Sequence, residues 1–196
     1  MNAQRLETSR LLNRFGFGPR PGEYAQALAD GVLATRTKVL TVPAVDADAA
    51  SVVEPEITDL GPRPKPNTKE VVPFSIAMRF QSQQMVMWWL DRMASSDHGL
   101  TERMTWFWHG HWATSVQKLN YPLPMFKQNK TLRSNCLGNF ATMTKAMIDD
   151  GALQFWLDGQ ENSVKAPNEN LGRELMELFT LGVGRYSEDD VKNISR

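Results

Sequence analysis

Two of the three histidines in this chain lie in the segment Leu100–Ser115, which also contains three of the six tryptophans. The histidines are His109 and His111, in the run TWFWHGHW. Imidazole nitrogens bind transition metals and transfer protons near neutral pH, and large aromatic side chains can exclude water around them. This segment therefore has the residue types that a metal site or an acid–base site requires.

The geometry of the two histidines depends on the secondary structure that carries them. Apolar residues recur at helical spacing, and Thr101 followed by Glu102 suits a helix start, so we predict a helix over Thr101–Ser115. Residues two apart point roughly 160° apart on a helix but to the same side of a strand. A metal clip that uses both histidines would therefore need the helix to break at Gly110. The alternative is two buried, hydrogen-bonded imidazoles with a purely structural role.

A second set of polar residues lies in APNENLGRELMELFTLGVG, on a predicted helix that begins near position 168. Glu169, Arg173 and Glu177 are spaced four apart, and Asn170 and Glu174 form a second row beside them. A stripe of leucines occupies the opposite face. Three interpretations stay open: a solvated face with surface ion pairs, a buried structural network, or part of a functional site.

We expect these two predicted helices to be neighbours in the core, because a buried arginine or imidazole needs hydrogen-bonding partners. The candidate catalytic residues are His109, His111, Arg173, Glu174 and Glu177. The candidate metal ligands are the same residues without the arginine, and a divalent transition metal suits their imidazole and carboxylate groups. Metal-assisted hydrolysis or redox chemistry is the reaction class that such a centre predicts.

Composition limits the other classes of function. Lysine plus arginine equals aspartate plus glutamate, so the net charge is zero and no field favours nucleic acid. A single cysteine, Cys136, excludes an internal disulfide and a thiolate cluster. No segment is apolar enough for a membrane span, and the charged N-terminus is not a secretory signal, so the default expectation is a cytoplasmic location.

Helical periodicity accounts for most of the chain, and we predict one all-α domain over residues 1–196, an irregular bundle of about eight helices. Val42–Pro73 is the exception. It carries six of the eleven prolines and is predicted to be a long irregular arm. Near the end of the chain, Ser187 and Asp190 have the spacing of a capping box, which predicts a last short helix.

Three motifs resemble the bacterial family called "domain of unknown function 1800": RLLNRFGFGP at Arg10–Pro19, ERMTWFWHGHW at Glu102–Trp112, and PNENLGRELMELFTLGVG at Pro167–Gly184. The resemblance implies a mostly helical fold without a settled activity. Members are often exported and usually longer, so the chain corresponds to their N-terminal part. It is then expected to be truncated at the C-terminus, with self-association or a partner chain completing its core.

Two hypotheses on function follow from these observations. The first is an enzyme with a His/Glu/Arg centre between two core helices. The second is a non-catalytic interaction or assembly module that uses the proline-rich arm and exposed apolar faces.

Overall fold

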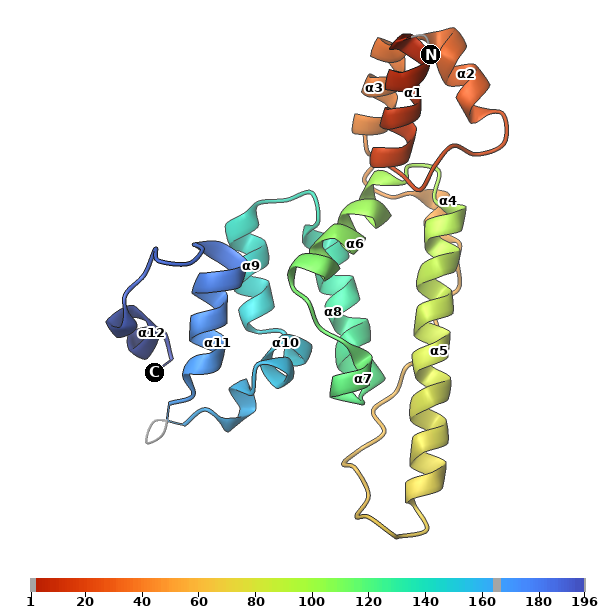
Figure 1. The fold of residues 1–196 in the computed structure, drawn as a ribbon. Coiled ribbons are helices and arrows are strands. Elements are labelled where there is room, and N and C mark those ends of the chain that lie inside the picture. Colours follow the sequence, from red (N-terminus) through yellow and green to blue (C-terminus); the bar gives the residue numbers. More distant parts are fainter. Residues whose placement is uncertain (1–2, 164–166, 196) are drawn as a thin grey trace. The chain divides into compact units, whose positions relative to one another are not determined.

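A computed structural model describes residues 3–163 and 167–195 of the chain (Figure 1). Every regular element in these residues is helical, which confirms the all-α prediction. The described chain divides into two compact units. The N-terminal unit runs to Ile57 and also contains Arg79–Phe107, whereas the C-terminal unit contains Thr58–Met78 and the chain from Trp108 onward. Two helices, α5 (Val71–Ser95) and α6 (Leu100–His111), pass from one unit into the other.

Besides its parts of α5 and α6, the N-terminal unit contains α1 (Ala3–Arg14), α2 (Glu23–Asp30), α3 (Val32–Leu40) and α4 (Ala47–Ala50). Gly31, with φ of 86°, separates α2 from α3. The glycines after α1 allow a close backbone approach, because a Cβ atom on Gly99 would lie 2.9 Å from the Cα atom of Gly16. The turn before α6 therefore packs directly against the end of α1.

A buried ion pair joins α5 to α6 within the N-terminal unit. Glu102 is almost fully buried, and its carboxylate accepts hydrogen bonds from the Arg92 guanidinium at 3.0 Å and from the Trp89 indole at 3.1 Å. Arg92 also donates to the carbonyl oxygen of Ala49, which attaches α4 to the pair. Because both charges have partners, the cost of removing them from water is offset.

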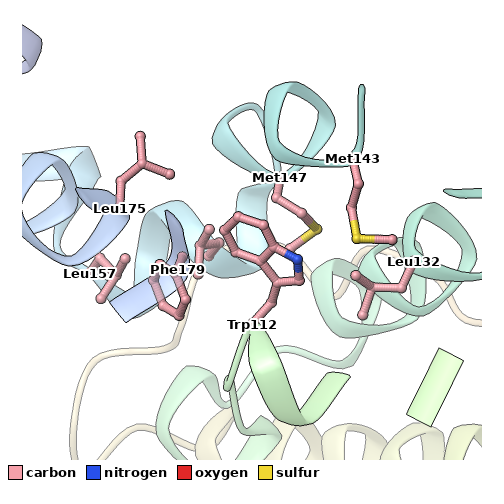
Figure 2. Packing of buried hydrophobic residues seen from close by; sticks show 8 residues of the cluster. Trp112, Leu132, Met143, Met147, Leu157, Leu175 and Phe179 are labelled. Carbon is pink, nitrogen blue, oxygen red and sulfur yellow. The ribbon is translucent and has the colours of Figure 1, made fainter. Parts of the chain in front are cut away.

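The other helices belong to the C-terminal unit: α7 (Val116–Leu119), α8 (Pro122–Asn135), α9 (Phe140–Ile148), α10 (Gly151–Trp156), α11 (Glu169–Glu174) and α12 (Glu188–Ile194), with a 3₁₀ turn, η1 (Gly159–Glu161), and a π-helical segment, η2 (Leu175–Thr180). Trp112 is fully buried at the centre of their core. Figure 2 shows this cluster, in which methionines of α9 approach the indole and Phe179 lies beside it. The side chains of Trp112 and Phe179 pack with ring centroids 4.9 Å apart.

A short polar chain crosses the interior of the C-terminal unit. The Thr114 hydroxyl donates to the Gln128 side chain at 2.5 Å, and the Gln128 amide donates to Asp150 at 2.7 Å. Asp150 also caps α10 by accepting from the N–H group of Leu153. Burial raises the pKa of Asp150 and outweighs these hydrogen bonds, which lower it.

The structure differs from the sequence prediction in number and extent of helices. Twelve α-helices are present in the described residues instead of about eight, because the short stretches α4 and α7 are helical as separate elements and Gly31 divides α3 from α2. The predicted arm, Val42–Pro73, contains α4 and the start of α5, and residues 53–70 between them carry no helix. None of the described helices combines the length and apolarity needed to cross a bilayer.

Candidate functional site

The two histidines lie in the last turns of α6, which remains helical through Gly110 to His111. Because these histidines are two positions apart on a continuous helix, their side chains point in directions that differ by roughly 160°. The break at Gly110 that a two-histidine clip requires does not occur. His109 and His111 consequently have different surroundings and are considered separately.

His111 makes a specific contact with the backbone of η2. Its Nε2 atom lies 3.0 Å from the carbonyl oxygen of Phe179. A carbonyl oxygen can only accept, so Nε2 must carry the hydrogen, and the lone pair of the neutral ring is then on Nδ1. Nδ1 has no hydrogen-bond partner among the described residues, and the His111 side chain is only half-buried.

Four aromatic rings surround this imidazole. The ring centroids of Trp108 and Trp112 lie 5.5 and 5.4 Å from that of His111, and those of Phe140 and Phe179 lie 6.1 and 6.0 Å away. All four pairs are in edge-to-face geometry, which is favourable for aromatic rings. These contacts and the Nε2 hydrogen bond together hold the imidazole in one orientation.

The Phe179 carbonyl is available because the helix ends just after it. Helix α11 continues as the wider π-helical segment Leu175–Thr180, and the N–H groups of Leu181 and Gly182 both donate to the Met176 carbonyl, at 2.8 and 3.0 Å. Carbonyl groups in the last turn have no later helical N–H to accept from. The His111 ring satisfies one of them, so the C-terminal end of α6 contacts η2. Short π-helical segments recur at functional sites.

His109 is half-buried near the end of α6. Burial lowers its pKa from the ordinary 6.5, because an imidazolium ion loses hydration in this position. His109 is therefore a neutral ring at physiological pH.

The polar row on α11 faces α12 instead of the imidazoles. The Arg173 guanidinium makes two hydrogen bonds to the Glu188 carboxylate, at 2.9 and 2.7 Å, and a longer one to Glu169 at 3.4 Å. The hydrogen bonding between these two side chains raises the pKa of Arg173 and lowers the pKa of Glu188. The Tyr186 hydroxyl donates to Glu177, and this hydrogen bond raises the pKa of Tyr186. Two of the candidate site residues, Arg173 of α11 and Glu177 of η2, therefore attach the last part of the chain to these two segments.

Glu174 is half-buried and has no hydrogen bond or ion pair within the described part of the chain. In that same part, no three side chains of histidine, cysteine, aspartate or glutamate are grouped as a metal ion would require. The five candidate residues are therefore not grouped in one site. His111 contacts the end of η2, and His109 has separate surroundings. Arg173 and Glu177 pair with Glu188 and Tyr186, and Glu174 has no such partner in the described residues.

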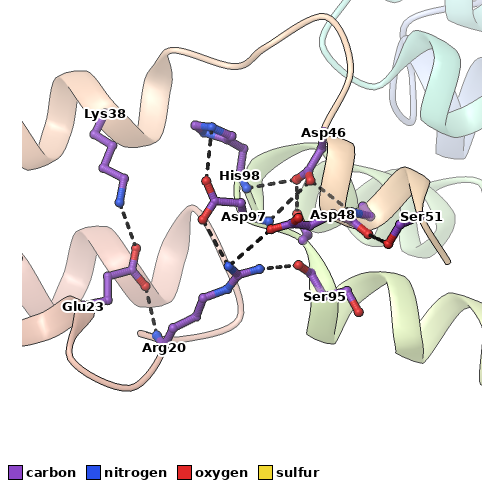
Figure 3. A network of polar contacts seen from close by, with 11 residues as sticks. Arg20, Glu23, Lys38, Asp46, Asp48, Ser51, Ser95, Asp97 and His98 are labelled. Atoms are coloured by element: carbon purple, nitrogen blue, oxygen red, sulfur yellow. Dashed lines mark hydrogen bonds and ion pairs between the residues drawn. The ribbon is translucent and has the colours of Figure 1, made fainter.

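Sequence reasoning missed a polar cluster in the N-terminal unit, shown in Figure 3. Arg20 donates to Asp97 at 3.1 Å and to the carbonyl of Ser95. Asp46 caps α4 and accepts from the Ser96 hydroxyl at 2.6 Å and from the N–H of His98 at 2.9 Å. Burial by itself would raise the pKa of Asp46, but these hydrogen bonds lower it to about 2. The sequence feature that could have indicated this cluster is the glycine- and proline-rich run FGFGPRPG, which contains Arg20.

A cavity of about 280 Å³ lies beside this cluster, between α1, α2 and α3. A smaller one of about 50 Å³ adjoins it at the glycine-containing loop after α1. Both are lined by the side chains of Leu12, Arg20, Glu23, Lys38 and Asp97. A concave site with converging polar groups is where small molecules usually bind.

The fold and these two regions define an all-α protein of two helical units, with an oriented imidazole in one unit and a charged cavity in the other. The chain belongs to the family described as "Protein of unknown function (DUF1800)", whose model matches residues 10–196. Comparison with curated proteins and with solved structures gives no match.

Proposed function

We propose that the C-terminal unit contains an enzymatic centre in which His111 acts as a general base. The observation that carries the proposal is the hydrogen bond between Nε2 and the Phe179 carbonyl. It assigns the ring hydrogen to Nε2 and leaves the Nδ1 lone pair for a substrate proton. Fixing the tautomer through a backbone carbonyl is the usual way in which proteins prepare a histidine for catalysis or for metal binding.

The reaction class that suits this arrangement is hydrolysis. Nδ1 removes a proton from a water molecule as the water oxygen forms a bond to the electrophilic atom of the substrate. The resulting imidazolium returns that proton to the leaving group when the substrate bond breaks. Throughout these steps Nε2 keeps its hydrogen bond to Phe179, at the negative end of the helix formed by α11 and η2, which favours the transient positive charge.

The other candidate residues have supporting roles in this proposal. His109 contributes a neutral ring at the same end of α6, and Glu174 offers a half-buried carboxylate without a described partner. Arg173 attaches α12 through Glu188, and Glu177 binds Tyr186 in the segment before that helix. The proposal requires no metal ion. The wider hypothesis of metal-assisted hydrolysis or redox chemistry, and the alternative of a non-catalytic interaction module, stay predictions.

The test is the substitution His111→Gln, because glutamine retains an N–H donor near Nε2 but has no basic nitrogen. We expect hydrolysis of a panel of ester, amide and phosphoester substrates to fall by about 10²–10⁴-fold, the usual contribution of general acid–base catalysis.

Circular dichroism and the melting temperature of His111→Gln serve as the folding control. A folded variant with wild-type rates would contradict the proposal, as would a wild-type chain that turns over no substrate in the panel.

A further inference from the structure

The charged cavity of the N-terminal unit is separate from the proposed catalytic centre and involves none of its residues. Its apolar wall is formed by Leu12 of α1, Ala27 of α2 and Ala34 of α3. Its volume of about 280 Å³ is near the lower end of the range for small-molecule sites. A cavity of this size can hold a small metabolite.

The charged side chains of the cavity are arranged as opposite pairs. Lys38 lies 3.5 Å from Glu23, and Arg20 lies 3.1 Å from Asp97. Arg20 is also held by the carbonyl of Ser95 and by a 3.7 Å contact with Asp48, so its guanidinium is already occupied. The pair formed by Lys38 and Glu23 has one long contact, and the lysine side chain is 55% exposed. The other oxygen of Glu23 accepts a hydrogen bond from the backbone N–H of Arg20 at 2.9 Å, which holds the carboxylate in place. This pair is the one that a ligand can separate at low cost.

A ligand with a single charge can pair with only one of these two side chains. A carboxylate bound to Lys38 would leave Glu23 without its cation, and an ammonium group bound to Glu23 would leave Lys38 without its anion. A ligand with both groups compensates both side chains at once. Asp30, which also lines the cavity, accepts from Gln26 at 2.7 Å and has no cation beside it in the described structure, so it offers a second carboxylate to an ammonium group.

We propose that this cavity binds a small zwitterion with an amino and a carboxylate group, of the free amino acid class. Its carboxylate pairs with Lys38, and its ammonium group lies between Glu23 and Asp30. The side chain of the ligand contacts the apolar wall formed by Leu12 and its neighbours. Arg20 and Asp97 position the rim of the cavity and do not exchange partners.

The experiment is a calorimetric titration of the full chain with each free α-amino acid. Each is compared with two matched analogues: the same molecule without its amino group and the same molecule without its carboxylate. We expect saturable binding of at least one amino acid, and binding of both analogues weaker by about tenfold or more, because each analogue lacks one charged hydrogen bond. Lys38→Met and Glu23→Gln should each weaken binding by a similar factor.

Lys127→Met is the matched control, because Lys127 is an exposed lysine of α8 in the other unit. It should leave the affinity unchanged. Equal or tighter binding of the carboxylate alone would show an anion site, and equal or tighter binding of the amine alone would show a cation site. Either result overturns the proposal, as does the absence of saturable binding or an affinity that does not respond to Lys38→Met.

Discussion

His109 and His111 are separated only by Gly110, yet their surroundings differ. The His111 ring hydrogen bonds to the Phe179 carbonyl, whereas burial lowers the pKa of His109. A histidine with a depressed pKa is neutral in the folded protein at pH values where the unfolded chain already binds a proton. His109 therefore links the stability of the fold to pH.

We predict that the free energy of unfolding decreases as the pH falls below about 6.5, the ordinary pKa of histidine. In that range the unfolded state binds more protons than the folded state, so stability must rise with pH. The loss should level off below the lowered pKa of folded His109. Urea unfolding at a series of pH values measures the slope, and His109→Gln should flatten it. An unchanged slope in this variant would show that His109 does not contribute.

At the scale of elements, the packing of α12 on α11 depends on Gly172. A Cβ atom at this position would lie 2.5 Å from Cγ2 of Ile194 and 2.7 Å from the Ser195 hydroxyl. Helix α12 begins with the predicted capping box, in which Ser187 and Asp190 bond each other's backbone, so its start is determined locally. The position of α12 against α11 depends on the absence of a side chain at Gly172 and on the ion pair between Arg173 and Glu188.

Gly172→Ala should destabilise the C-terminal unit by about 1–3 kcal/mol, because the added methyl group forces Ile194 and Ser195 away from α11. Gly151→Ala is the control, because Gly151 also lies in a helix but no atom lies within 4 Å of the position where its Cβ atom would be. This control should be neutral or slightly stabilising. Thermal unfolding of both variants measures this difference. A Gly172→Ala melting temperature equal to that of Gly151→Ala would mean that α12 accommodates the methyl group without loss of stability.

The contacts of Arg173 favour the first interpretation of this polar row, a solvated face with surface ion pairs. Arg173, Glu169 and Glu188 have side chains that are 34, 39 and 64% exposed, so water screens their ion pairs. Removal of Arg173 would leave no buried charge, and the severe destabilisation expected for a buried network does not apply to it.

At the scale of the whole molecule, residues 53–70 are the longest described stretch without a helix. Their backbone lacks the hydrogen-bond ladder that protects helices from proteases, and Val53 is 87% exposed. The stretch belongs to the predicted proline-rich arm, whose role stays a prediction.

Limited digestion should cut the chain first within residues 53–70. Arg63 and Lys65 are each followed by proline, which trypsin cleaves poorly, so a protease of broad specificity is the suitable probe. Mass spectrometry of the first fragments locates the cut. First cleavage inside α5 or α8 would show that these helices open more easily than the stretch between α4 and α5.

Local rules were sufficient for much of the secondary structure. Helix α9 spans Phe140–Ile148, and Asn139 caps it by accepting from the N–H group of Thr142. The capping box at Ser187 was recognisable from two residues three apart. These features depend on hydrogen bonds between near neighbours in the sequence, which residue type and spacing determine directly.

Only the tertiary structure decided what the chemically capable residues contact. The carbonyl that orients His111 is 68 residues away in the chain, and the carboxylate of Asp97 is 77 residues from Arg20. A change from α- to π-helical winding after Glu174 alters which residues share a face, so the regular four-residue spacing no longer predicts where Glu177 points. Such contacts follow from how whole helices pack against one another, and the free energy of that packing is not contained in any single segment.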